Sequence, residues 1–88
     1  MLTVDFSRHT QKFLKKAEKI LAARLFEAAS ELGNDPFPHG VKRVENQVVE
    51  GEKVFRIRIG AYRILYAVNP EKKRVLIVNI DKRQRVYD

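Results

Sequence analysis

The sequence predicts an α+β fold: an N-terminal strand, a helical hairpin, and then a four-stranded, mainly antiparallel meander with the helices packed on one face of the sheet. Three observations predict it. An apolar stripe of helical period extends over residues 8–32. Apolar and polar residues alternate before and after this stripe, and turn residues separate the extended segments. Helices on one face of a small sheet allow both apolar surfaces to be buried.

The first strand and the first helix are predicted from the N-terminal residues. Leu2, Val4 and Phe6 alternate with polar residues, which indicates a short strand. Ser7 can cap the helix that follows, because its hydroxyl can accept a hydrogen bond from a first-turn amide. The helical pattern extends over residues 8–32, and its apolar stripe consists of Leu14, Ala17, Leu21, Leu25, Ala28 and Leu32, widened by Phe13 and Ile20.

From Ala22 a second apolar stripe appears through Phe26 and Ala29, and the helical pattern changes face near Ala17–Ile20. The change indicates a break, and therefore a helical hairpin. No Gly or Pro marks the break, so one long helix also fits the sequence. Gly33 is the predicted C-cap of the helical segment, and Pro36 is a stop signal within the loop Asn34–Gly40.

Turn residues delimit the four strands of the meander. The first strand is predicted at Val41–Val49, with Val44 and Val48 facing the core and an imperfect phase that allows a bulge. The last strand, Val75–Ile80, is almost continuously apolar, which predicts that both of its faces are covered. Between them the stretch from Lys53 to Tyr66 reads KVFRIRIGAYRILY and predicts a hairpin.

The predicted hairpin collects arginines on one face. Gly60-Ala61 suits a two-residue turn, which would set Arg58 opposite Arg63. Arg56 would share their face, while the opposite face would be filled by Phe55, Ile57, Ile59, Ile64 and Tyr66. Like charges directly opposite one another are destabilising, and neither strand contains an acidic residue. We therefore expect a partner that brings negative charge.

The composition limits the possible partners. The 88 residues predict one domain, 1–88, with a formal net charge of +7 from 18 basic and 11 acidic residues. This charge favours a polyanion, an acidic protein or an anionic membrane surface. A membrane is disfavoured, because no apolar run approaches the ~18 residues of a spanning helix and the N-terminus does not resemble a signal peptide. The absence of Cys excludes disulfides and thiol nucleophiles and suggests a cytoplasmic protein.

The common catalytic residue sets are missing. His9 and His39 have no second His, Cys or carboxylate at metal-ligand spacing, so both are interpreted as surface residues and neither a metal nor another cofactor is expected. What remains is arginine, on the hairpin and in a basic tail that carries Arg83 and Arg85, followed by Tyr87. Guanidinium groups match phosphate oxygens and an aromatic ring can stack on a base, so RNA is the predicted ligand. The alternative is a solvated sheet face and a frayed tail.

The hairpin Phe55–Tyr66 and the basic ending DKRQRVYD together resemble the RelE/ParE superfamily of toxin–antitoxin toxins, and its RelE branch in particular. The resemblance covers the whole chain, and its most specific parts are Phe55–Tyr66 and Lys82–Tyr87. It implies a RelE-like toxin domain, a cognate RelB-like antitoxin and ribosome-dependent cleavage of mRNA in the A site. The implied reaction is attack of the substrate 2′-hydroxyl on the adjacent phosphate, which leaves a cyclic phosphate and inhibits translation.

The resemblance also implies roles for individual residues. The expected catalytic set is Arg56, Arg58, Arg63, Arg83 and Tyr87, and the expected RNA-binding residues are Lys53, Lys82 and Arg85. Arg58 and Arg63 would stabilise negative charge in the transition state. Arg83 would stabilise or protonate the leaving 5′-oxygen, and Tyr87 would orient the nucleotide by stacking or through its hydroxyl.

Two departures from the family pattern bear on mechanism. The best-known RelE proteins have lysines at the positions of Arg56 and Arg58, and because arginine keeps its proton at neutral pH, a general base is not expected there. The spacing from Arg83 to Tyr87 is also shorter than in some relatives. A ParE-like toxin directed at DNA gyrase and an inactive binding module with the same fold are the alternatives. A standalone ribonuclease is disfavoured, because it would want an acid–base pair of His or Glu.

Overall fold

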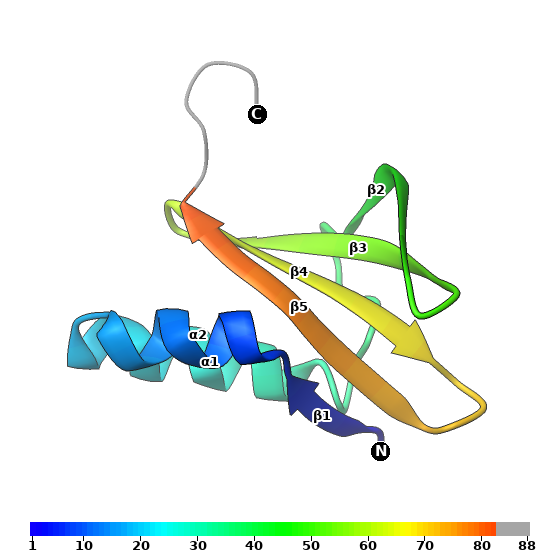
Figure 1. Ribbon diagram of the computed structural model, residues 1–88, viewed down its shortest axis with the longest axis horizontal. Coiled ribbons are helices and arrows are strands. Elements are labelled where there is room, and N and C mark those ends of the chain that lie inside the picture. The colour runs from blue at the N-terminus through cyan, green and yellow to red at the C-terminus, as the bar shows by residue number, and fades with distance from the viewer. Residues whose placement is uncertain (83–88) are drawn as a thin grey trace.

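The computed structural model describes residues 1–82, which form one five-stranded sheet and two helices (Figure 1). In chain order the elements are β1 (Thr3–Phe6), α1 (Arg8–Lys16), α2 (Lys19–Glu31), β2 (Lys42–Val49), β3 (Glu52–Ile59), β4 (Tyr62–Asn69) and β5 (Arg74–Lys82). The strand order across the sheet is β1-β5-β4-β3-β2, and both helices lie on the same side of it (Figure 1). The predicted α+β class, helical hairpin and antiparallel meander are confirmed. Neither helix of the described chain is both long enough and apolar enough to cross a membrane.

β1 occupies one edge of the sheet, where it is parallel to β5 and pairs Val4 with Val75. The N–H of Leu2 donates to the carbonyl oxygen of Gly33 at 2.8 Å, directly after α2. Leu32, rather than the predicted Gly33, is the C-cap of α2. β1 therefore ties the end of the second helix to the far edge of the meander.

Two side-chain caps explain where the helices begin. Ser7 caps α1: its hydroxyl oxygen accepts from the N–H of Thr10 at 3.1 Å, and the same hydroxyl donates to the carbonyl of Val78 in β5 at 2.8 Å. Glu18 caps α2, where its carboxylate accepts from a first-turn amide at 3.1 Å. Ala17, between the helices, has an extended backbone. The predicted break is thus confirmed, and the Glu18 carboxylate replaces the Gly or Pro that the sequence lacks there.

The core lies between α2 and the side of the sheet that faces the helices. Its buried side chains include Leu25, Ala29, Leu32, Ile64, Tyr66, Val75, Ile77 and Ile80. The Tyr66 hydroxyl donates to the carbonyl of Pro36 at 2.6 Å, which fastens the loop after α2 to the sheet. Burial of the ring, with the nearby Asp35 carboxylate, raises the pKa of Tyr66, so the phenol stays protonated and keeps this hydrogen bond.

Two apolar residues were predicted in the core and are exposed instead. Ile20 is 71% exposed, because α2 turns Leu25 and its stripe toward the sheet and leaves Ile20 on the solvent side. Val48 is 61% exposed, because β2 is irregular and its alternation does not continue along the strand.

A bulge in β5 explains part of its continuous apolar run. Leu65 pairs with Asn79 while Tyr66 pairs with Ile77, so Val78 is an extra residue on β5. The extra residue reverses the alternation, and Ile77 and Ile80 are therefore both buried against the helices. Val78 itself is only half-buried, so the predicted cover on both faces is not complete there.

Candidate functional site

The β3–β4 hairpin has the predicted register. Gly60, with φ of 61°, and Ala61 form its two-residue turn, and Arg58 pairs with Arg63. Ile57 and its neighbours on the other face pack against the helical core, so the arginines project from the opposite side of the sheet. The three hairpin arginines therefore lie on one face of the sheet, as predicted.

β2 adds a further cation to this face through its irregular register. Near the β2–β3 turn Val49 pairs with Glu52, and without interruption that register would place Glu45 opposite Arg56. The register shifts within β2, and Lys42 pairs with Arg56 instead. Because of this shift, the residue opposite Arg56 is basic instead of acidic. Lys42 was missed as a site residue, because the only sequence signal for the shift was the imperfect phase of the strand.

Four cationic side chains surround one cavity on the face away from the helices. The cavity has a volume of about 170 Å³ and is lined by Gly40, Lys42, Arg56, Ile57, Arg58 and Arg63. The cations come from two neighbouring rows across the strands, Lys42 beside Arg56 and Arg58 beside Arg63. Mutual repulsion makes such a cluster unfavourable on its own, and a bound anion relieves it. We call this the cationic cavity.

Asp81 brings one carboxylate to the same face. It pairs with Arg63 across β4 and β5, and its Oδ1 accepts from Arg63 Nε at 3.1 Å. The Arg63 side chain is 18% exposed and that of Asp81 39%, so the ion pair is only partly screened by water. Arg58 is exposed and makes no ion pair within residues 1–82. Asp81 therefore orients Arg63 and leaves the cationic cavity with a net positive charge.

Two other predicted site residues, Lys53 and Lys82, lie within residues 1–82 and away from the cationic cavity. Lys82 pairs with Tyr62, whose ring meets that of Phe13 in α1, so Lys82 lies on the helix-facing side of β5. Lys53 is exposed and alternates with the arginines of β3, which places it on the opposite face from them. The remaining predicted residues, Arg83, Arg85 and Tyr87, lie outside the described residues.

A second cavity adjoins the cationic one at Gly40, Ile57 and Arg58. Its volume is about 470 Å³, and it lies between α2, the loop after α2 and β3. Six of its ten lining residues are glycine or apolar, and the other four are Glu31, Asp35, His39 and Arg58. A cationic hollow beside a partly aliphatic one can accommodate a nucleotide, which carries its charge on the phosphate and presents an apolar face on the base.

The chemistry of the described site is electrostatic. Neither a carboxylate nor an imidazole is among the six residues that line the cationic cavity. Across residues 1–82 no group of three His, Asp or Glu side chains could hold a metal ion. The site can therefore bind a phosphate and stabilise charge that develops on it, and the nearest carboxylate described on this face, that of Asp81, is paired with Arg63.

A helical hairpin on one face of a five-stranded sheet and a cationic cavity on the other define a small α+β protein with an anion-binding face. The chain belongs to the family described as the ParE toxin of the type II toxin–antitoxin system parDE, whose model matches residues 4–87. The predicted membership of the RelE/ParE superfamily is thereby confirmed. No curated protein matches the chain by sequence.

Solved structures of RelE toxins share this architecture. The archaeal RelE–RelB complex from Pyrococcus horikoshii has a TM-score of 0.80 at 25% identity, covering 97% of this chain and 98% of that one. The toxin–antitoxin complex RelBE2 from Mycobacterium tuberculosis has a TM-score of 0.75 at 29% identity, covering 93% and 91%. The isolated E. coli RelE toxin has a TM-score of 0.74, covering 99% and 89%, and at 19% identity supports the fold alone.

Proposed function

We propose that this toxin is a ribosome-dependent endoribonuclease that cleaves mRNA in the ribosomal A site and so inhibits translation. The observation that carries the proposal is the cationic cavity, in which Arg56, Arg58 and Arg63 gather with Lys42 on the face that the helices leave open. Its volume and charge suit one backbone phosphate. The adjoining cavity, six of whose ten lining residues are glycine or apolar, offers space for the neighbouring base. Because translating ribosomes are the proposed target, we propose that the toxin acts in the cytoplasm.

In the proposed reaction the 2′-hydroxyl of the substrate attacks the adjacent phosphorus, and the bond to the 5′-oxygen of the next nucleotide breaks. The products are a 2′,3′-cyclic phosphate and a free 5′-hydroxyl, and the proton released by the 2′-hydroxyl balances the one gained by the 5′-oxygen. Arg58 and Arg63 stabilise the extra negative charge of the pentacovalent transition state. Asp81 holds Arg63 in position for this role.

The proposal assigns no general base to the arginines, because guanidinium keeps its proton at neutral pH. Rate enhancement then comes from charge stabilisation and from the alignment of the mRNA on the ribosome. Arg83 at the leaving oxygen and Tyr87 at the nucleotide complete the proposed set, and both lie outside the described residues. Lys53, Lys82 and Arg85 are further proposed RNA contacts, and Arg85 also lies outside the described residues.

A RelB-like antitoxin is the proposed protein partner. Among similar structures, those from Pyrococcus horikoshii, Mycobacterium tuberculosis and Methanococcus jannaschii are complexes of a RelE-type toxin with its antitoxin. The net charge of +7 suits an acidic partner as well as RNA. We propose that the bound antitoxin inhibits the toxin until the antitoxin is removed.

Inhibition of DNA gyrase is the second candidate function, because the family model that matches residues 4–87 is the one described for ParE toxins. In that case the cationic face would contact the gyrase protein, and no RNA bond would break. An inactive binding module with this fold is the third possibility.

The test measures mRNA cleavage on purified translating ribosomes and gyrase supercoiling in parallel. We expect cleavage by the wild type, a fall of about 10²–10³-fold for Arg63→Ala or Arg58→Ala, and no change for Arg24→Ala. Arg24 is the control because it is an exposed arginine on α2, outside the cationic cavity. Intact mRNA with inhibited gyrase would establish the second function, and no effect in either assay would establish the third.

A further inference from the structure

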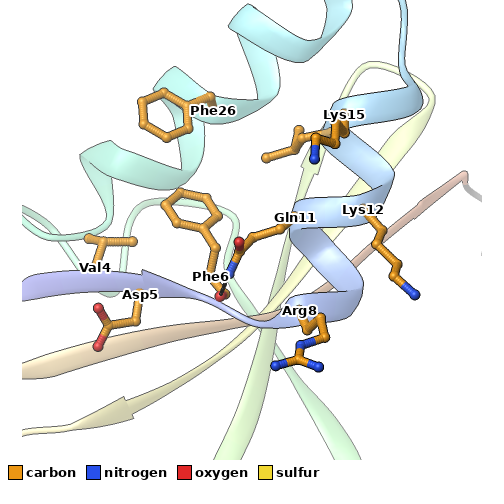
Figure 2. A pocket seen from close by; sticks show the side chains of 9 residues that line it. Val4, Asp5, Phe6, Arg8, Gln11, Lys12, Lys15 and Phe26 are labelled. Carbon is orange, nitrogen blue, oxygen red and sulfur yellow. Dashed lines mark hydrogen bonds between the residues drawn. The ribbon is translucent and has the colours of Figure 1, made fainter.

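A large hollow lies away from the cationic cavity, between β1, α1 and α2 (Figure 2). Its volume is about 970 Å³. It borders β1 at one edge of the sheet, whereas the cationic cavity is built on β2, β3 and β4 toward the other edge. None of the residues that line one of these hollows lines the other. We call it the helix-side groove.

The helix-side groove contains an aromatic platform. Phe6, at the end of β1, stacks on Phe26 of α2, with the ring centroids 5.2 Å apart and the ring planes 14° from parallel (Figure 2). Phe26 is 53% exposed, whereas Leu21 and Leu25 of the same helix pack in or against the core. Val4 lines the hollow beside this pair. A stacked and half-exposed aromatic pair in a concave site offers apolar surface that a partner can cover.

The wall of the groove on the α1 side is cationic. Arg8, Lys12 and Lys15 line it at intervals of one helical turn, so they follow one side of α1 over about 10 Å. α1 contains no Asp or Glu. Asp5 is the one acidic residue in the lining, and its carboxylate accepts from Arg74 Nε at 2.8 Å. The groove therefore combines an apolar floor with a net positive wall.

We propose that the helix-side groove anchors an amphipathic helix of the antitoxin. Its apolar side covers the stacked Phe6 and Phe26 rings, and its Asp and Glu residues, one turn apart, face the cationic row of α1. RNA is the competing occupant, because its phosphates could contact the cations while a base stacks on a phenyl ring, and the experiment below distinguishes the two. The regular one-turn spacing along α1 favours a helix that runs alongside it.

This proposal rests on the antitoxin partnership and is independent of the ribonuclease activity. Because the groove and the cationic cavity share no residue, anchoring and toxicity are separable by mutation. Substitutions in the groove are expected to produce a toxin that still arrests growth and that its antitoxin no longer neutralises. A partner bound over the cationic cavity alone would not show this separation.

The experiment titrates the toxin with the full-length antitoxin encoded beside its gene, by calorimetry at two salt concentrations. Phe26→Ser and the double charge reversal Lys12→Glu/Lys15→Glu are the groove variants. Ile20→Ser and Lys19→Glu are the matched controls, because both residues are exposed on α2 and neither lines the groove. Circular dichroism establishes that each variant is folded, and growth arrest is measured without antitoxin.

We expect each groove variant to weaken antitoxin binding by at least about 10-fold, with the charge reversal also reducing the salt dependence, and each control to bind as the wild type does. Growth arrest should be unchanged in all four. Groove variants that bind the antitoxin like the controls would overturn the proposal. So would weakened ribosome binding with normal antitoxin binding, or loss of toxin self-association with normal antitoxin binding. If the wild type cleaves no mRNA, the proposed function fails while the titration still decides this proposal.

Discussion

Replacement of Gly33 by Ala tests whether the junction between α2 and β1 is as tight as the structure makes it. Gly33 is buried directly after the C-cap of α2, and its carbonyl accepts from Leu2 N–H. A Cβ atom at this position would lie 2.6 Å from the Leu2 carbonyl oxygen and 2.9 Å from Cγ2 of Val4. The nearer contact is with backbone, which cannot rotate away as a side chain can.

Two opposing effects set the size of the change. The φ of Gly33 is not in the left-handed region, so alanine is compatible with its backbone and, if there were room, would stabilise the fold by about 0.4–1 kcal/mol. The overlap instead forces β1 and the end of α2 apart, which typically costs about 1–3 kcal/mol. We therefore expect destabilisation and, at about 4–8 °C per kcal/mol for a domain of this size, a Tm lower by roughly 5–20 °C.

Urea and thermal denaturation of purified Gly33→Ala measure this change, with Gly51→Ala as the control. Gly51 has φ of 80° and open space around it, so alanine there meets backbone strain without overlap and should cost only about 1 kcal/mol. An increase in Tm for Gly33→Ala would refute the reasoning, because it would mean that β1 moves away at negligible cost.

The remaining predictions concern two side-chain contacts. Ser7→Ala removes both the α1 cap and the hydrogen bond to β5, so the free energy of unfolding in urea should fall by about 1–2 kcal/mol, whereas an unchanged value would show that these contacts are replaced by water. Asp81→Asn removes the carboxylate that orients Arg63, so binding of a short RNA should tighten while single-turnover cleavage on ribosomes slows. The control Asp5→Asn breaks a similar ion pair, with Arg74, at the far edge of the sheet and should change neither quantity; weaker RNA binding by Asp81→Asn would contradict the assigned role.

Local sequence determined the central hairpin and the start of α1. A two-residue turn fixes the register of the strands that it joins, so the pairing of Arg58 with Arg63 follows from Gly60-Ala61 without knowledge of the rest of the chain. The Ser7 cap is equally local, because its hydroxyl bonds an amide three residues away. These interactions close short loops, and short-range chemistry is sufficient to specify them.

Tertiary structure decided the contacts that complete the site. The shift within β2 places Lys42, rather than Glu45, opposite Arg56. Asp81, which is 18 residues after Arg63 in the chain, contacts it from β5. The helix-side groove likewise needs β1 beside α2, with Phe6 stacked on Phe26. Each of these pairings joins segments whose relative position is set by packing of the whole core. The arginines were therefore evident in the sequence. The neighbouring Lys42 and Asp81, and the helix-side groove, were determined only by the folded chain.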